Sequence, residues 1–283
     1  MILKHCLLVQ NDCYKANKKM TNNKPTGIVV HSTGANNKTL KRYVQPVSSQ
    51  SCYKTVLEDL GKNQYGNHWN QPSKTLGTQI CVHAFIGTNA KGEVETYQTL
   101  PFDVCCWGVG SGKNGSYNYN PQARIQFEIC EDGLKDADYF NKAMTEAIEF
   151  CAYLCKKYNL AVNKISSHRE SYLAGYGSNH GDPEHWMKNF GKDMNWFRQE
   201  VQKLLSKQEV APLKKFYRVQ SGAFTVKSYA VNHQKKLAYA GFESFIAQSG
   251  NYWKVQSGAY TDKANAQAQV AKLKSKGFNA FIV

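Results

Sequence analysis

The stretch GIVVHSTG at residues 27–34 contains a short run of β-branched apolar residues, IVV, that ends at a histidine, His31. A run of this length between glycines predicts a buried strand, which places His31 at the edge of a sheet. An imidazole at such an edge is well placed to bind a metal ion. Two further metal-binding residue types lie far downstream, His168 in ISSHRE and Asp182 in NHGDP.

Together, these three residues could hold one Zn²⁺ ion. Two neutral imidazoles and one carboxylate leave the fourth tetrahedral position open for water, as in catalytic rather than structural zinc sites. A lone histidine at a strand end is more often a hydrogen-bonded structural residue. The spacing by itself therefore leaves both interpretations open.

The residues around these positions resemble the type 2 N-acetylmuramoyl-L-alanine amidases, many of which are bacteriophage endolysins or prophage-encoded wall lysins. The matching segments are IVVHSTG (28–34), IQFEI (125–129), SHR (167–169) and HGDP (180–183), and the resemblance covers about residues 1–205. It implies an α/β fold with a mixed central sheet flanked by helices. It also implies a zinc hydrolase that cuts the amide bond between N-acetylmuramic acid and the L-alanine of the stem peptide.

This resemblance implies that His31, His168 and Asp182 are the zinc ligands. The third ligand in the family is an Asp or a Cys directly before a proline, and Asp182 precedes Pro183. Two residues earlier the family often has a lysine that stabilises the oxyanion, and this chain has His180 there. An imidazole can also donate a hydrogen bond to the developing charge, so His180 takes that role. The alternative is that His180 is itself a ligand.

Glu128 matches the catalytic glutamate of the family. It belongs to the alternating run RIQFEI, in which it shares a strand face with Gln126. A carboxylate beside the zinc ion can accept a proton from water and pass it to the leaving amine. The competing interpretation is a solvent-facing strand residue, which is what we expect of Glu131 and Asp132 at the following turn.

Trp107 and His83 are the candidates for substrate contact. Trp107 lies in CCWGVG (105–110), where Gly108 replaces a histidine that many relatives carry directly after the tryptophan. A glycine there still allows close backbone approach. His83 follows the apolar run ICV and is expected on a strand near the cleft, although a structural histidine fits equally well. No role is predicted for His185.

The composition is that of a globular protein with room for two domains. The 283 residues are 42% hydrophobic, and no run approaches the roughly 18 apolar residues of a membrane span. The start, MILKHCLLVQND, has no recognisable secretory signal, so we expect synthesis in the cytoplasm and action on the cell wall after release. The nine cysteines, an odd number, favour buried thiols over a disulfide framework. Among them, Cys151 and Cys155 fit a helix core.

The formal net charge of +15 calls for a polyanionic partner. Nucleic acid is the generic candidate, but the lysines are scattered and no nucleic-acid-binding module accompanies them. Anionic polymers of the bacterial wall fit the charge equally well. We therefore expect peptidoglycan as the main partner, with anionic wall polymers as a further one and no specific nucleic acid.

Hydrophobic periodicity predicts a long amphipathic helix over residues 136–158 that packs on the sheet bearing His31 and Glu128. A second helix is predicted over 194–205. The polar stretch 206–213 contains charges and a proline, as is typical of a linker between domains. The expected division is a catalytic domain at 1–205, a linker at 206–213 and a second domain at 214–283.

The second domain repeats itself with a period of 36 residues, because VQSGAF at 219–224 recurs as VQSGAY at 255–260. Each unit reads as strand, helix and strand, so two βαβ units share one sheet in a small ferredoxin-like α+β domain. The repeat resembles the sporulation-related SPOR domain, which binds glycan strands of peptidoglycan on its exposed sheet face. The glycan-binding side chains implied by this resemblance are Arg218, Gln220, Lys254 and Gln256.

The sequence therefore predicts a modular zinc amidase of the endolysin or autolysin type. The leading alternative is a non-catalytic peptidoglycan-recognition protein of the same fold. The presence of all three ligand residues and of Glu128 argues against it. An alternative from another class is a nucleic-acid-binding protein that uses the positive charge.

Overall fold

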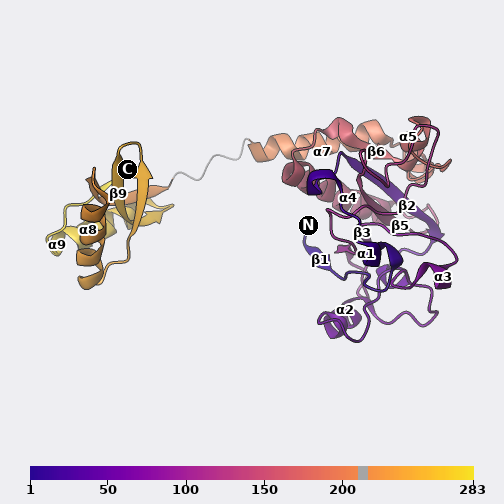
Figure 1. The fold of residues 1–283 in the computed structure, drawn as a ribbon, viewed down its shortest axis with the longest axis horizontal. Helices are drawn as coiled ribbons and strands as arrows, with labels where there is room; N and C mark the ends of the chain where they lie inside the picture. The colour runs from indigo at the N-terminus through magenta and orange to yellow at the C-terminus, as the bar shows by residue number, and fades with distance from the viewer. Residues whose placement is uncertain (210–215) are drawn as a thin grey trace. The chain divides into compact units, whose positions relative to one another are not determined.

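The structure is a computed structural model that describes the backbone of residues 1–209 and 216–283, and their side chains except at 207–209. The chain divides into two compact units, Met1–Gln208 and Glu209–Val283, which we call the first and second units (Figure 1). The first unit contains the candidate metal ligands, and the second contains the 36-residue repeat.

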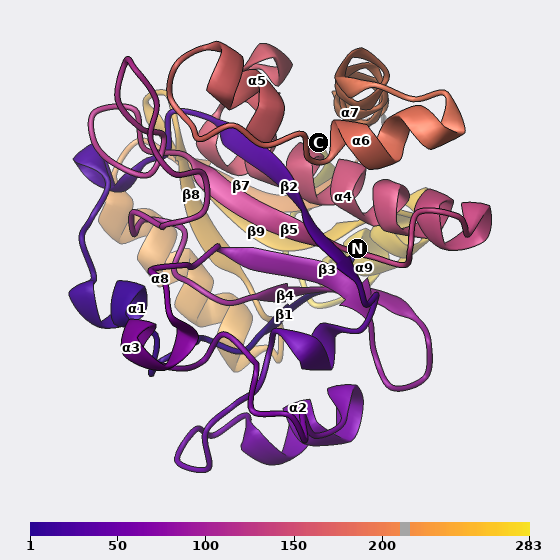
Figure 2. The ribbon, with the colours of Figure 1, turned by 90° about the vertical axis from the view of Figure 1, so that its right-hand side faces the viewer.

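A six-stranded mixed sheet with the strand order β1-β4-β3-β5-β2-β6 forms the centre of the first unit (Figure 2). Only β3 and β4 pair in antiparallel fashion, and all other neighbours are parallel. This mixed sheet confirms the predicted fold class. The strands are β1 (Leu3–His5), β2 (Ile28–Asn36), β3 (Ala84–Thr88), β4 (Val94–Gln98), β5 (Ile125–Glu131) and β6 (Ile165–Ser167).

Helix α4 covers one face of this sheet, as its apolar stripe predicts. It begins after the N-cap Asp136, whose side chain accepts a hydrogen bond from Tyr139 N, and ends at Tyr158. Cys151 and Cys155 lie in its core face, and all nine cysteines of the described residues are free thiols. The helices are α1 (Asp12–Ala16), α2 (Tyr53–Leu60), α3 (Ser73–Leu76), α4 (Ala137–Tyr158), α5 (His168–Leu173), α6 (Glu184–Met187) and α7 (Met194–Glu209).

The neighbouring strands β2, over its first five residues, and β5 are buried on both faces, which is typical of parallel strands. Ile28 and Val30 of β2 pack with Phe127 of β5 in the core beneath α4. The alternate residues therefore point to the opposite face. In this way the strand period of two places His31 and Glu128 on the side of the sheet away from α4.

Helix α7 is longer than the sequence predicted. It runs from Met194 to Glu209, so residues 206–209 of the expected linker continue the helix. The remaining linker residues, 210–213, lie outside the described residues, as do 214 and 215. The linker stretch begins with SKQE, which has good helix formers and no proline, so the helix need not end at Leu205.

The second unit is a four-stranded antiparallel sheet with the order β10-β7-β9-β8. Two helices pack on one face of it, around a core of Val219, Leu237, Val255 and Leu273. This is the predicted ferredoxin-like arrangement. The elements are β7 (Tyr217–Phe224), α8 (Lys227–Tyr239), β8 (Phe245–Ser249), β9 (Tyr252–Tyr260), α9 (Lys263–Ser275) and β10 (Phe281–Ile282).

The internal repeat is also visible in the hydrogen bonds that join its two halves. Ser221 Oγ donates to the carbonyl of Asn279 over 3.1 Å, and Ser257 Oγ donates to the carbonyl of Glu243 over 2.8 Å. Both the serines and the acceptors are 36 residues apart. Each half therefore donates a hydrogen bond to a backbone carbonyl of the other half. A single 36-residue unit would lack both bonds, in keeping with the need for two units in one domain.

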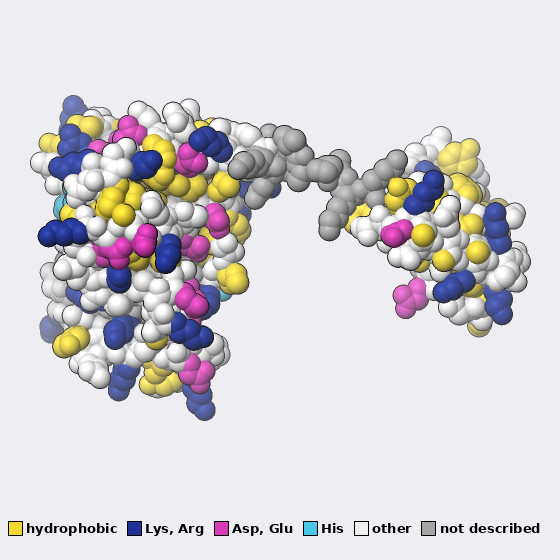
Figure 3. All heavy atoms as spheres, turned by 180° about the vertical axis from the view of Figure 1, so that it is seen from behind, with side chains coloured by type: hydrophobic (Ala, Val, Ile, Leu, Met, Phe, Trp, Pro, Cys, Tyr) yellow, Lys and Arg dark blue, Asp and Glu magenta, His cyan; other side chains and the backbone are white. Residues whose placement is uncertain are grey.

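Lysine and arginine side chains are spread over both units on the face shown in Figure 3, rather than gathered in one patch. None of the described helices combines the length and the apolar character needed to cross a membrane.

Candidate metal centre

Three side chains from distant segments meet beside the middle of β2. His31 comes from β2, His168 is the first residue of α5, and Asp182 precedes Pro183, the N-cap of α6. The two Nδ1 atoms are 3.0 Å apart. His31 Nδ1 lies 3.3 Å from Asp182 Oδ2, and His168 Nδ1 lies 3.3 Å from Asp182 Oδ1.

These distances fit a shared metal ion. With metal–ligand bonds of about 2.0–2.1 Å, two donor atoms of a tetrahedral site lie roughly 3.3 Å apart. The three observed separations are within 0.3 Å of that value, with each histidine measured to a different oxygen of Asp182. Two imidazole nitrogens and one carboxylate oxygen are also the donor types of catalytic sites with one open position. Among the described residues, His31, His168 and Asp182 form the cluster of metal-binding side chains that lie close enough together to hold one metal ion.

Hydrogen bonds outside the cluster hold each of the three side chains in place. His31 Nε2 lies 3.1 Å from Gln126 Oε1, and His168 Nε2 lies 3.2 Å from Ser178 Oγ. The backbone N–H of Ser32 donates to Asp182 Oδ2 over 3.3 Å. Such outer partners orient the ligands of metal sites and are a normal part of their construction.

The position of His168 follows from the way α5 begins. Ser167 and Glu170 form a capping box, in which each side chain bonds to the backbone N–H of the other residue. Arg198 of α7 then pairs with Glu170 at 2.8 Å. These contacts fix the first turn of α5, and His168 is the first residue of that turn.

Asp182 and His168 favour the protonation states that a metal ion requires. Burial would raise the pKa of the Asp182 carboxyl, but hydrogen bonds with His168 and His31 outweigh burial and hold this pKa below its ordinary value. Burial lowers the pKa of the His168 imidazole, which favours its neutral form. Carboxylate anions and neutral imidazoles are the forms that bind divalent metals.

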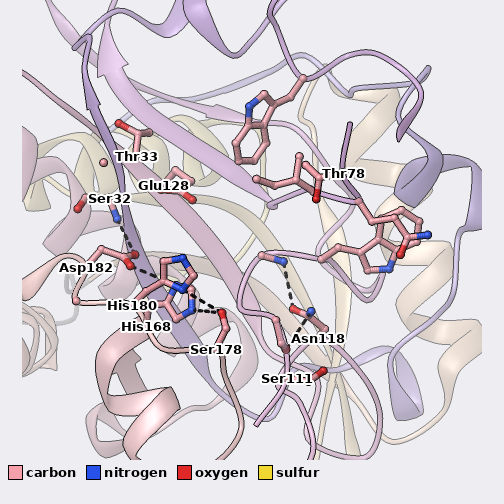
Figure 4. A pocket seen from close by; sticks show the side chains of 18 of the residues that line it. Ser32, Thr33, Thr78, Ser111, Asn118, Glu128, His168, Ser178, His180 and Asp182 are labelled. Atoms are coloured by element: carbon pink, nitrogen blue, oxygen red, sulfur yellow. Dashed lines mark hydrogen bonds and ion pairs between the residues drawn. The ribbon is translucent and has the colours of Figure 1, made fainter. Parts of the chain in front are cut away.

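A cavity of about 760 Å³ opens over the cluster. Glu128, His168, His180 and Asp182 lie on one side of it and Thr78, Ser111 and Asn118 on the other (Figure 4). Aromatic side chains complete the lining at Trp69, Trp107 and Tyr119. Trp107 is thus where a substrate-binding residue is expected.

Glu128 is not a solvent-facing strand residue. It is 8% exposed, it lines the cavity, and its Oε2 atom is buried without a hydrogen-bond partner among the described residues. Burial raises the pKa of this carboxyl well above its ordinary value, and the nearby carboxylates of Asp182 and Glu131 raise it further. A group with this environment suits proton transfer.

His180 lies at the exposed rim of the cavity, next to the cluster rather than within it. Its Nδ1 is 3.0 Å from Ser178 Oγ, and its ring centre is 4.4 Å from that of His168. The carboxylate of Asp182, not His180, completes the three-residue group with His31 and His168.

His83 does not reach the cavity, and its prediction as a substrate-binding residue is wrong. The side chain is completely buried, its Nε2 lies 2.8 Å from the carbonyl of Val104, and its Nδ1 accepts from Gln126 N over 3.0 Å. Burial lowers the pKa of His83 to about 4. It is therefore a neutral structural histidine that joins β5 to the loop after β4.

Sequence reasoning missed Glu131 and His185. Glu131 was expected at a solvent-facing turn, but it is buried in β5 and accepts a hydrogen bond of 2.5 Å from Ser32 Oγ. His185 lines the cavity and pairs with Glu131 at 3.1 Å. Because α6 begins at Glu184, no helical spacing links His185 to Asp182, and the sequence offered no signal for this residue.

In the second unit, the two glutamines predicted to be exposed are buried. Arg218 is exposed and Lys254 is half-buried, as a binding face requires, but Gln220 and Gln256 pair across the central strands. On the outer strands, Phe281 of β10 lies beside Gln220, and Phe245 of β8 lies beside Gln256. These four side chains form a row across the sheet. These two rings are 53% and 49% exposed, and sequence reasoning did not single them out.

Comparison with known proteins gives two family matches. Residues 21–185 match the N-acetylmuramoyl-L-alanine amidase family, and residues 213–283 match the SPOR domain. The chain is 26% identical over 134 residues to the N-acetylmuramoyl-L-alanine amidase CwlA of Bacillus sp, which is 46% of this chain and 52% of that protein. It therefore spans about half the length of this relative.

Similar solved structures exist for both units. The peptidoglycan-binding domain of the Bacillus subtilis cell wall lytic enzyme CwlC is 37% identical and covers 24% of this chain and 86% of its own, with a TM-score of 0.23. The Staphylococcus aureus hydrolase AmiA in complex with its ligand is 18% identical and covers 75% of this chain and 88% of its own, with a TM-score of 0.47.

Proposed function

Because the chain belongs to the N-acetylmuramoyl-L-alanine amidase family and carries a SPOR domain, we propose that it is a zinc-dependent peptidoglycan hydrolase. The bond it cuts is the amide between N-acetylmuramic acid and the L-alanine of the stem peptide. The observation that carries this proposal is the meeting of His31, His168 and Asp182 at tetrahedral spacing beside the unpaired carboxylate oxygen of Glu128.

His31, His168 and Asp182 would hold the zinc ion. A zinc ion bound there would supply Lewis acidity, which polarises a carbonyl group and acidifies water. Glu128 accepts a proton from the attacking water and returns it to the nitrogen of the leaving L-alanine. Its burial and its unpaired Oε2 support this role, because no other described residue competes for that oxygen.

His180 donates a hydrogen bond to the oxyanion that forms at the lactyl carbonyl. Its place at the cavity rim supports this role, and so does its contact with Ser178. Nδ1 of His180 contacts Ser178 Oγ, so Nε2 is the ring nitrogen that would face a substrate oxygen. Trp107 contributes an apolar wall for the substrate.

The second unit binds glycan strands through the face of its sheet that lies away from α8 and α9. The row Phe281, Gln220, Gln256 and Phe245 crosses all four strands. Aromatic rings can stack on sugar faces, and amides donate to and accept from hydroxyl groups. Arg218 and Lys254 add positive charge for anionic wall polymers.

The protein acts as an endolysin or autolysin that is made in the cytoplasm and reaches the wall after release. Products from purified sacculi test the activity. New L-alanine amino groups are expected, whereas new reducing sugars would indicate a glycosidase. Tight wall binding with no new ends of either kind would identify a non-catalytic recognition protein. Binding to DNA but not to sacculi at physiological salt would indicate a nucleic-acid-binding protein.

A further inference from the structure

We propose that Gln126 is a positioning residue of the metal centre. Hydrogen bonds that start at the backbone of the Trp107–Ser111 loop reach His31 through Asn118 and Gln126, and they decide which ring nitrogen of His31 faces the metal. This inference rests on the proposed function, because it takes His31 as a metal ligand.

The first step is the orientation of the Asn118 amide. The backbone N–H groups of Gly108 and Val109 both point at Asn118 Oδ1, each over 3.1 Å. Backbone N–H groups can only donate, so the atom that they meet must be the oxygen of this amide.

The second step carries this constraint to Gln126. The Nε2 of Gln126 lies 2.9 Å from Asn118 Oδ1 and 3.3 Å from the carbonyl of Tyr117. Both partners are acceptors, so the nitrogen of the Gln126 amide must face them. The Oε1 of Gln126 therefore faces His31 Nε2 at 3.1 Å.

The third step fixes the tautomer of His31. A carbonyl oxygen can only accept, so the Nε2 of His31 carries the proton. The Nδ1 is then the ring nitrogen left to give its lone pair to a metal ion that His168 and Asp182 also bind. Gln126 and His31 are 0% and 1% exposed, so no solvent competes with this bond.

The absence of a side chain at Gly108 leaves room for the Gln126 amide. A Cβ atom at residue 108 would lie 2.5 Å from Gln126 Oε1 and 2.9 Å from Val82 Cγ1. Any side chain at 108 therefore competes with the Gln126 amide for space. This explains the glycine directly after Trp107. Gly108 also lines the cavity. The hydrogen bonds that run from Gly108 and Val109 through Asn118 and Gln126 to His31, which we call the relay, therefore connect the substrate-facing loop to the metal centre.

The test uses the full-length protein and zinc competition against a chelating dye. Gln126→Met keeps the volume but removes the acceptor, and we expect zinc affinity to fall about 10–100-fold, the usual cost of losing an outer partner of a metal ligand. The tautomer is read directly by ¹⁵N NMR of the His31 ring without metal. Wild type should show the proton on Nε2, and Gln126→Met should show a mixture of the two tautomers.

Gly108→Ala disturbs the same relay without changing Gln126 itself. We expect a similar loss of zinc affinity, because the new methyl group displaces the Gln126 amide. The double variant with Gln126→Ala should bind zinc no more weakly than Gln126→Ala alone. Gly27→Ala is the matched control, since its Cβ would also lie 2.5 Å from a neighbour, the Lys164 carbonyl, while Gln126 is not among the three nearest neighbours of that Cβ. It should destabilise the fold and leave the zinc affinity of the folded protein unchanged.

Wild-type zinc affinity and an unchanged His31 tautomer in Gln126→Met would overturn the proposal, as would equal affinity losses in Gly108→Ala and Gly27→Ala. The proposed function fails in a different way. In that case wild type itself binds no zinc, or His31→Ala still binds it.

Discussion

The metal centre of the first unit and the sheet face of the second are built in opposite ways. In the first unit, His31 and His168 lie 137 residues apart in the chain, and each supplies one ring nitrogen to a group that Asp182 completes. In the second unit, the phenylalanine and glutamine of the row across the sheet each occur twice, 36 residues apart.

This contrast predicts how amino-acid substitutions affect the function of each region. A site assembled from unlike parts has no substitute for a missing part, so one substitution should remove its function. A site built from two copies should lose only part of its binding when one copy is lost. The five predictions below test the contrast, in order of decreasing effect.

Asp182→Ala should release the metal ion completely, because the remaining two imidazoles leave the site without its anionic ligand. Metal analysis of the purified protein measures this directly. His31→Ala should behave in the same way. A variant at Asp182 that keeps one equivalent of tightly bound metal would show that the carboxylate is not a ligand.

Glu128→Gln should abolish most turnover and keep the metal. The amide is nearly isosteric with the carboxyl but cannot carry the proton, and general acid–base groups typically contribute about 10²–10⁴-fold. A turbidity assay on cell walls, combined with metal analysis, separates the two effects. Lysis at near the wild-type rate would remove Glu128 from the mechanism.

His180→Ala should keep the metal and lower the rate roughly 10²–10³-fold, the usual cost of one oxyanion donor. Its partner variant for comparison is Asp182→Ala. If His180→Ala empties the site while Asp182→Ala does not, the two assignments are reversed.

The contribution of His83 to the folding stability of the first unit should fall as the pH decreases from about 6.5 to about 4. The pKa of His83 is lowered to about 4 by burial, whereas the unfolded chain takes up a proton near pH 6.5. The folded state therefore binds fewer protons in this window, and acid favours unfolding by up to roughly 3 kcal/mol. Urea unfolding at several pH values checks this, and His83→Gln should flatten the profile.

Phe245→Ala and Phe281→Ala should each weaken glycan binding roughly fivefold, which corresponds to about 1 kcal/mol for one aromatic contact. The rings are three strand spacings apart, about 14 Å, so their effects should add in the double variant. Pelleting with stripped glycan strands in a Glu128→Gln background measures this without digestion. Tyr239→Ala, an exposed aromatic on α8, serves as the control. A single variant that abolishes binding would contradict the two-copy design.

Much of the fold could be predicted, because its signals are local. The β-branched run at 28–30, the apolar stripe of α4 and the 36-residue period each reflect contacts that repeat along the chain. The end of α7 was predicted too early because residues 206–209, SKQE, contain no apolar residue that would continue the hydrophobic pattern.

The errors concern side chains whose partners come from distant segments. His83 reads as a strand histidine near a cleft, but Val104 and Gln126 occupy both its ring nitrogens. Glu131 looked solvent-facing until the structure placed Ser32 and His185 against it. No periodicity encodes such contacts, so they could not be predicted from the sequence.

The central claim is that one zinc ion, held by His31, His168 and Asp182, is required for amide cleavage. The most direct measurement follows new L-alanine amino groups on purified sacculi after chelation and during stepwise return of zinc. Amino groups should cease to appear after chelation, and the full rate should return at one equivalent of zinc. Amino groups released at an undiminished rate by the metal-free protein would contradict it.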